Sequence, residues 1–249
     1  WESIFFRALS GSIIAFLMAI YFGFEKLKTK KPLGHFIRAF SASGCVVFYI
    51  YGINNLMLSE NIAIAHSAPI IAAFLAVPVL GERIGILRTS AILIGFIGVI
   101  IIVKPGTDLF KLESLYPLIS ACFMASVYLS TRSVMSTDSS VAIIFYYSFA
   151  LLITSLIFFP KDFVMPNISQ MIIAFSLGIM GSLGHFFMSQ AAKNADVAVT
   201  SPFEYSSFIF VGLMGFLIFS EVPNYSIYLG GFIIISSGIF IAYRERKNN

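Results

Sequence analysis

A few side chains that can carry a charge or a proton stand inside long apolar stretches of this sequence. Arg7 lies near the start of the first stretch, His66 and Ser67 lie within the third, and Glu204 follows Pro202 in the eighth. An ionisable group inside a bilayer is costly, so each is a candidate for binding a substrate or a proton. A guanidinium suits a carboxylate, and a carboxylate suits an amine. Together, Arg7 and Glu204 would suit a zwitterionic metabolite.

Each candidate also has a structural alternative. Arg7 could extend its guanidinium to the outer lipid headgroups. His66 could act as a proton acceptor, or it could be a neutral histidine hydrogen-bonded within a helix bundle. Glu204 could pair with Arg7 or with a neighbouring hydroxyl. Gln190, near the end of the seventh stretch, could bind substrate or donate a hydrogen bond at the membrane surface.

The composition decides the class of protein. Of the 249 residues, 58% are hydrophobic and 11% are charged, whereas soluble domains carry about 25% charged residues. The sequence therefore predicts an all-α polytopic membrane protein whose surroundings are a lipid bilayer. The net charge of +4 does not indicate nucleic-acid binding, because membrane proteins concentrate Lys and Arg in cytoplasmic loops. Cys45 and Cys122 show no metal-ligand spacing.

The elements that must position these groups are apolar helices. Short connections and breakers such as Pro32, Pro105 and Pro160 separate the apolar stretches. The stretch 61–83, NIAIAHSAPIIAAFLAVPVLGER, has about the length that crosses a ~30 Å hydrocarbon layer, although Pro69 and Pro78 interrupt it. We predict nine spans, at about 3–22, 34–54, 61–80, 86–103, 113–131, 139–159, 169–190, 197–219 and 225–243.

The charges between the spans predict an orientation. With the loop that contains Lys26, Lys28, Lys30 and Lys31 in the cytoplasm, twelve Lys and Arg residues, Arg38 among them, fall on that side. Three fall on the other side, namely Lys104, Lys111 and Lys161, with Arg7 set aside as intramembrane. Cytoplasmic loops carry the excess of positive charge, so the C-terminus is expected in the cytoplasm.

A shift of 139 positions aligns the third span with the eighth without a gap. It matches His66 to Tyr205 and Ser67 to Ser206, and the predicted orientation makes the two spans run in opposite directions. This indicates two inverted repeats, at 1–106 and 107–249. If each repeat has five helices, the first helix of the first repeat is missing before Trp1. Inverted repeats are typical of transporters that bind substrate near the midplane between them, which adds Tyr205 to the candidate site.

Several motifs resemble a known family. They are FFR at 5–7, the run from Pro69 that ends in PVLGER at Arg83, GFIGVIIIVKPG at 95–106, ADVAVTSPFEY at 195–205 and FSE at 219–221. In their order and spacing the chain resembles the drug/metabolite transporter superfamily, in its EamA-type ten-helix branch. The resemblance implies secondary transport of a small organic metabolite at the cell inner membrane. It implies no cofactor, and a monomer or a homodimer.

Within that family, FFR, PLGHFIR at 32–38 and the KPG turn are similar to the S-adenosylmethionine uptake transporter group. Such a ligand could stack on aromatic side chains, which also serve as belt or packing residues; the candidates are Tyr49, Tyr51, Tyr128, Tyr146 and Tyr147. Two alternatives remain. One is a truncated remnant that inserts but does not transport. The other is an intramembrane enzyme, which the sequence disfavours because it lacks a G-x-S-x-G elbow and an H-E-x-x-H signature.

Overall fold

The structure is a computed structural model that describes residues 2–80, 86–104, 111–159, 163–194, 206–220 and 224–248. Within these ranges the regular secondary structure is helical and contains no strand. The chain divides into two compact units. Unit 1 comprises Trp1–Ser43 and Ser130–Asn194, and unit 2 comprises Gly44–Leu129 and Ala195–Asn249. Each unit therefore takes segments from both of the predicted repeats, and the assignment of the repeats to 1–106 and 107–249 stays a prediction.

The helices have the length and apolarity of membrane spans. Among the described residues, six helical segments meet this criterion. They are Glu2–Phe22, Pro32–Asn55, Leu58–Ala76, Leu112–Met135, Ser140–Ile157 and Ile168–Asn194. The shorter segments Thr89–Val103 and Tyr225–Ile241 are also apolar helices. The chain is an all-α polytopic membrane protein, as its composition predicts.

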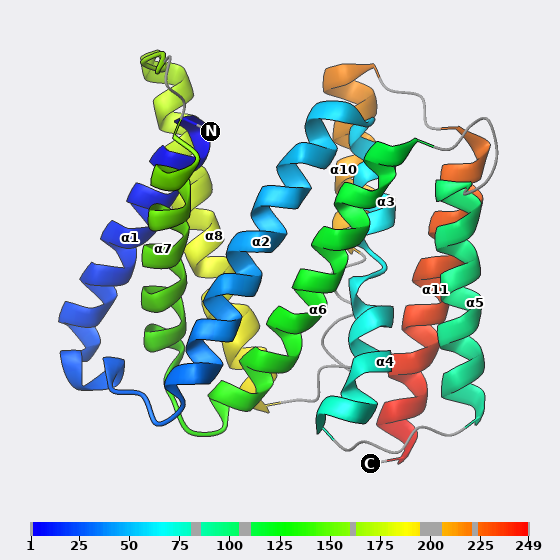
Figure 1. The fold of residues 1–249 in the computed structure, drawn as a ribbon, viewed down its shortest axis with the longest axis horizontal. Coiled ribbons are helices and arrows are strands. Elements are labelled where there is room, and N and C mark those ends of the chain that lie inside the picture. Colours follow the sequence, from blue (N-terminus) through cyan, green and yellow to red (C-terminus); the bar gives the residue numbers. More distant parts are fainter. Residues whose placement is uncertain are drawn as a thin grey trace. The chain divides into compact units, whose positions relative to one another are not determined.

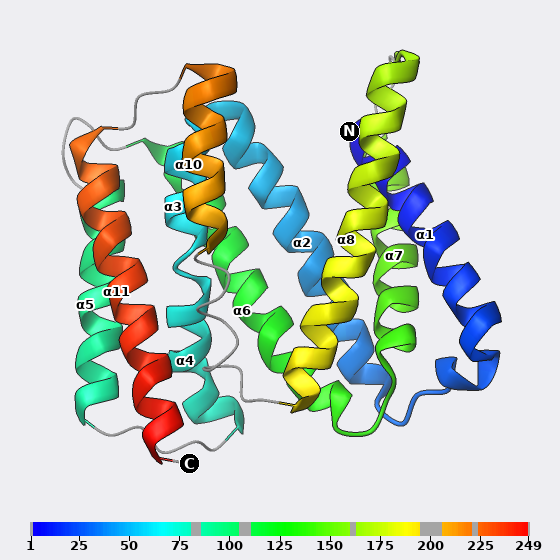
Figure 2. The ribbon, with the colours of Figure 1, turned by 180° about the vertical axis from the view of Figure 1, so that it is seen from behind.

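Three helices of unit 1 pack side by side: α1 (Glu2–Phe22), α7 (Ser140–Ile157) and α8 (Ile168–Asn194) (Figures 1 and 2). Small residues allow the close approach of α1 and α8. A Cβ atom on Gly178 would collide with the Ser10 hydroxyl and the Arg7 carbonyl, so only glycine fits there. Such small-residue contacts are typical of helix packing in membranes. Unit 1 also contains the short helix η1 (Phe24–Leu27).

Unit 2 is built around the pair α5 (Ile86–Val103) and α11 (Tyr225–Asn248), which lie side by side in both views (Figures 1 and 2). Gly98 and Gly230 face each other: a Cβ on Gly98 would lie 2.8 Å from the Gly230 carbonyl oxygen. The apolar core beside this contact includes the fully buried Ile70 and Ile234. The same unit contains η2 (Leu112–Ser114) and α10 (Ser206–Phe219).

Two long helices contribute to both units. The first part of α2 (Pro32–Asn55), up to Ser43, belongs to unit 1, and the rest belongs to unit 2. In α6 (Leu115–Met135) the order is reversed, and the last turns from Ser130 belong to unit 1.

The predicted third span, 61–80, differs from expectation, because it is two helices rather than one. Helix α3 (Leu58–Ala65) ends before His66, and α4 (Ala68–Leu80) begins after Ser67 (Figure 1). Of the two prolines in this stretch, Pro69 stands at the break, whereas α4 continues through Pro78. The break falls on two residues that the sequence singles out for chemistry.

Candidate substrate-binding site

The break between α3 and α4 follows from local chemistry. Proline has no N–H, so Pro69 cannot donate to the carbonyl of Ala65, as a continuous helix would require. It also disfavours the helical conformation of the preceding residue. The chain tightens at this point: the N–H of Ser67 donates to the Ile64 carbonyl at 3.0 Å, three residues back. The helix resumes when the N–H of Ile71 donates to the Ser67 carbonyl at 3.0 Å.

A cavity of about 300 Å³ lies beside this break in unit 2. Its lining is mostly apolar and includes a few hydroxyl, thiol and imidazole groups. The lining residues are Cys45, Tyr49, Ile62, Ala65, His66, Ala68, Pro69, Ser120, Ala121, Met124, Tyr128 and Ser207. Concave, largely apolar sites with a few polar groups are the usual form of small-molecule sites, and ~300 Å³ is the lower end of their range.

Two tyrosines give the cavity an aromatic character. Tyr49 of α2 is half-buried and Tyr128 of α6 is buried. The two helices are joined next to the cavity, where the Ser120 hydroxyl donates to the Cys45 carbonyl at 2.9 Å. Of the five tyrosines that the sequence offers for ligand stacking, these two line the cavity. Tyr51 lies outside the lining, and its ring contacts that of Tyr116.

His66 connects the helix break to the start of α10. Its Nε2 lies 2.9 Å from the Ser207 hydroxyl oxygen, and both residues line the cavity. The repeat analysis expects His66 to lie with Tyr205, and the structure brings it to Ser207, two residues further along. Glu204 and Tyr205 lie outside the described residues, so their place in the site stays a prediction.

Ser67 lies at the break but does not line the cavity. The residue is fully buried, at 0% exposure. Its hydroxyl oxygen has no hydrogen-bond partner within the described part of the chain. A direct role for Ser67 in substrate binding therefore stays a prediction.

The other candidates belong to unit 1. Arg7 is half-buried in α1, and its guanidinium lies against Gly181 of α8, where a Cβ would stand 3.5 Å from Arg7 Nη2. Within the described ranges, no carboxylate forms an ion pair with it. Gln190 is half-buried near the end of α8, and its main-chain carbonyl accepts a hydrogen bond from Asn194 Nδ2 at 2.8 Å. Neither contact decides between binding and structural roles.

Arg38 is a group whose importance the sequence analysis missed, because it counted Arg38 among the cytoplasmic charges. The structure places it inside α2 at 1% exposure. Its Nε donates to Thr131 Oγ1 at 3.0 Å, and its Nη2 lies 3.4 Å from His185 Nδ1. Its guanidinium carbon stands 5.5 Å from the centre of the Tyr147 ring. The signal in the sequence is its position inside the predicted span 34–54.

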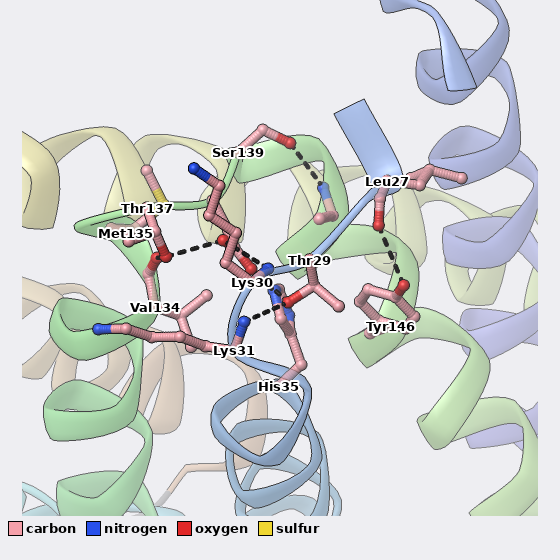
Figure 3. Close-up of polar contacts among 12 residues, drawn as sticks. Leu27, Thr29, Lys30, Lys31, His35, Val134, Met135, Thr137, Ser139 and Tyr146 are labelled. Carbon is pink, nitrogen blue, oxygen red and sulfur yellow. Dashed lines mark hydrogen bonds and ion pairs between the residues drawn. The ribbon is translucent and has the colours of Figure 1, made fainter. Parts of the chain in front are cut away.

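A second network that sequence reasoning missed ties two connections of unit 1 together around Asp138. Figure 3 shows Thr29, Lys30 and His35 of this network. The Thr29 hydroxyl and the backbone N–H of Lys30 donate to the carboxylate. His35 Nε2 lies 3.0 Å from Asp138 Oδ2, with both side chains almost fully buried. Nearby, the Tyr146 hydroxyl donates to the Leu27 carbonyl at 3.0 Å. These contacts hold the α1–α2 connection against the α6–α7 connection.

The same contacts set the charge of Asp138. Burial by itself raises the pKa of the Asp138 carboxyl. Hydrogen bonds from Thr29, Thr137, the Lys30 N–H and His35 outweigh burial and hold this pKa well below its usual range. Asp138 is therefore ionised at neutral pH, and its charge is already satisfied by these donors.

The comparisons with known proteins place this architecture in a family. The model of the EamA-like transporter family matches residues 1–104 and 112–243. The chain belongs to the EamA-like transporter family. The S-adenosylmethionine uptake transporter of Rickettsia felis is 29% identical over 247 residues, which cover 99% of this chain and 84% of that protein. The riboflavin transporter of Vibrio cholerae is 29% identical over 90% of this chain and 76% of that protein.

The fold of this EamA-like chain also occurs among solved structures. One crystal structure matches it with a TM-score of 0.70 at 16% identity, over 100% of this chain and 90% of the other. At this identity the match supports the fold alone. The family and the named relatives support a transporter of a small molecule in a lipid bilayer, and they favour transport over catalysis.

Proposed function

We propose that this chain is a secondary transporter that carries S-adenosylmethionine across the inner membrane by alternating access. The observation that carries the proposal is the cavity at the α3–α4 break, which combines two tyrosines with neutral polar groups. The similarity to an S-adenosylmethionine uptake transporter over nearly the whole chain points to the same substrate class.

The cavity suits the chemistry of this substrate. S-adenosylmethionine carries a sulfonium cation and an aromatic base, and both are attracted to aromatic faces such as those of Tyr49 and Tyr128. Among the described residues, the lining of the cavity includes no carboxylate or ammonium group, so these residues would recognise a ligand by aromatic contact and hydrogen bonds. His66 and Ser207 supply polar atoms at the break, and His66 is the candidate proton acceptor.

The proposed energy source is an ion gradient or a counter-substrate. The sequence contains no G-x-x-x-x-G-K-[ST] loop to hold nucleotide phosphates. Uptake into sealed vesicles should therefore respond to ionophores and proceed without ATP. Uptake that strictly requires ATP, with ionophores having no effect, would refute secondary transport.

The proposed orientation has the Lys26–Lys31 loop and the C-terminus in the cytoplasm. Single cysteines at positions 28 and 161, in a background without Cys45 and Cys122, can be labelled in intact cells with a reagent that does not cross the membrane. We expect labelling at position 161 and protection at position 28. The reverse pattern would overturn both the orientation and the charge argument behind it.

The substrate is tested by uptake of radiolabelled S-adenosylmethionine into cells that express the protein. Tyr49→Leu should raise the concentration for half-maximal uptake about 5- to 30-fold, the range that one cation–π contact supports. The matched control is Tyr51→Leu, on the same helix and equally half-buried but outside the cavity. If Tyr49→Leu and Tyr51→Leu change uptake equally, the cavity is not the substrate-binding site.

A panel of competitors decides between substrates. Unlabelled S-adenosylmethionine, riboflavin and individual amino acids are added in excess to the same assay. Competition by S-adenosylmethionine alone supports the proposal. Direct uptake of riboflavin, without uptake of S-adenosylmethionine, would replace the proposed substrate and leave the cavity as the site.

A further inference from the structure

Arg38 is a buried cation that has no acidic partner within the described part of the chain. Three helices, α6, α8 and α7, present to its guanidinium a hydroxyl from Thr131, an imidazole from His185 and an aromatic face from Tyr147. All three contacts are with neutral or aromatic groups. The remaining nitrogen, Nη1, is buried and has no hydrogen-bond partner among the described residues. One edge of the guanidinium is therefore left with an unused donor.

Asp138, the acidic residue that contacts the start of α2, does not neutralise the Arg38 cation. Asp138 binds His35, one turn before Arg38, and it also accepts from Thr29, Thr137 and the Lys30 N–H. It forms no ion pair with Arg38. An arginine stays protonated in proteins, and a buried charge without a partner is strongly unfavourable. An ionisable residue inside a membrane span is by default a candidate functional site.

A second arginine lies along the same helix. Arg38 contacts His185 of α8, and the guanidinium of Arg7 lies against Gly181, four residues earlier. Positions four apart share one face of a helix, so two cations from α1 and α2 flank one face of α8. Gly181 has no side chain to screen Arg7, and a larger residue there would meet the guanidinium at 3.5 Å.

We propose that Arg38, supported by Arg7, binds a carboxylate group in unit 1. The planar fork of a guanidinium matches the two oxygens of a carboxylate, and such pairs are among the strongest hydrogen bonds in proteins. Thr131 and Tyr147 fix the plane of the Arg38 fork before the ligand binds. The carboxylate belongs either to the transported molecule or to a free organic acid. The first assignment rests on the function proposed above, whereas the site itself does not.

The site is tested on the purified full chain with sodium formate as the carboxylate probe. Thermal unfolding is measured in formate and in chloride at equal ionic strength. We expect formate to raise the unfolding temperature of the wild type above its value in chloride. Arg38→Met should remove this difference, and in chloride it should be at least as stable as the wild type, because the unpaired charge is gone. The matched control is Arg132→Met, a half-buried arginine of the same region, which should keep the response to formate.

A purely structural arginine gives a different result. Arg38→Met would then be destabilised equally in formate and chloride, and the proposal would be wrong. If the Arg38→Met variant does not insert into the membrane, Arg38→Lys is the deciding variant. Lysine keeps the positive charge but lacks the planar fork of the guanidinium. Folded Arg38→Lys that loses the response to formate supports the site, while an unchanged response, or failure of both variants to fold, overturns it.

The two sources of the carboxylate are separated by transport. S-adenosylmethionine and its decarboxylated analogue differ only in this group. If the carboxylate of the substrate binds Arg38, the wild type should prefer S-adenosylmethionine at least 10-fold and Arg38→Met should show almost no preference. Equal preference in both proteins, with stabilisation by formate intact in the wild type, assigns the site to a free acid. Absence of any S-adenosylmethionine uptake by the wild type refutes the proposed substrate. The unfolding measurements in formate then still test the carboxylate site at Arg38.

Discussion

In unit 2 the polar groups that line the cavity of about 300 Å³ are hydroxyl, thiol and imidazole groups, and the cavity lies beside a helix break. In unit 1 a charged group, the Arg38 guanidinium, lies within the continuous helix α2 at 1% exposure. The first arrangement suits aromatic and neutral parts of a ligand, because such groups are recognised by contact area and a few hydrogen bonds. The second suits a charged group, because a buried cation gains most from an anion.

Within unit 1 the two acid–base sites also differ. Asp138 receives several hydrogen bonds and needs no further partner, which is the pattern of a structural group. Arg38 keeps one donor, Nη1, unused among the described residues, as the proposed carboxylate site requires. Burial alone does not distinguish the two groups, because both side chains are buried. Four predictions test this comparison.

The largest effect is expected from removing the charges assigned to the substrate. Arg7→Ala and Glu204→Gln should each lower uptake about 100-fold or more, because the substrate's own charge would be left unpaired in a low-dielectric site, which costs about 3–5 kcal/mol. The amount of protein in the membrane should stay near normal. Uptake of radiolabelled S-adenosylmethionine and an immunoblot of membranes measure the two quantities.

The control for this pair is Glu25→Gln, an exposed acid of the α1–α2 connection. It should leave uptake unchanged. Near wild-type uptake by both Arg7→Ala and Glu204→Gln would show that these charges hold helices together and that the substrate binds elsewhere.

The next effect concerns the helix break. Pro69→Ala restores an N–H that can donate to the Ala65 carbonyl and continue the helix. We expect uptake to fall about 10-fold while stability rises by about 1–3 kcal/mol, since a break costs helix energy. Uptake and thermal unfolding of the purified protein check the two changes.

Pro78→Ala is the matched control for the break. It also adds an N–H to α4, but at a position where the helix is already continuous and outside the cavity lining. It should stabilise the protein without a comparable loss of uptake. If both proline variants lower uptake equally, the break has no special role in the site.

A smaller effect is expected at the contact that joins the break to α10. His66→Ala and Ser207→Ala should each reduce uptake about 3- to 10-fold, and a double-mutant cycle should show a coupling of about 1 kcal/mol. Additive losses in the cycle would mean that the 2.9 Å contact does not contribute to transport, and that His66 acts alone.

The smallest effect on transport is expected at Asp138, where the effect on stability dominates. Asp138→Asn should cost about 1–3 kcal/mol of unfolding free energy, because it leaves buried donors without a charged acceptor. Its folded-state pKa is depressed, so the carboxylate adds stability at neutral pH. That stability is lost as the pH falls below about 4, the unfolded value, toward the folded pKa.

The contribution of the Asp138 carboxylate is measured by the free energy of unfolding of the wild type and of Asp138→Asn between neutral and acidic pH. The difference between the two proteins should shrink as the pH falls through the acidic range. A difference that is constant with pH would mean that the charge of Asp138 is not what stabilises the two connections.

The sequence by itself determined the class of protein. Membrane helices must satisfy their own backbone hydrogen bonds, so apolarity over about 20 residues is sufficient to predict them. The same reasoning found the stretch around His66, because an ionisable group beside a proline is unusual in such a segment. The sequence named Tyr49 and Tyr128 only among five tyrosines that could stack on a ligand. It could not select these two, because periodicity does not distinguish the faces of a helix that is apolar all round.

Only the tertiary structure decided which of these groups meet. Thr131 and His185 are 93 and 147 residues from Arg38, and Asp138 is 103 residues from His35. Counting charges assigns an arginine near a span end to the cytoplasm, whereas packing of α6, α7 and α8 buries it. The cavity beside the helix break likewise depends on how residues of α2, α3, α4, α6 and α10 come together around Pro69, and no local sequence pattern specifies a space. Local chemistry fixed each helix, and long-range packing fixed which polar atoms remained unsatisfied.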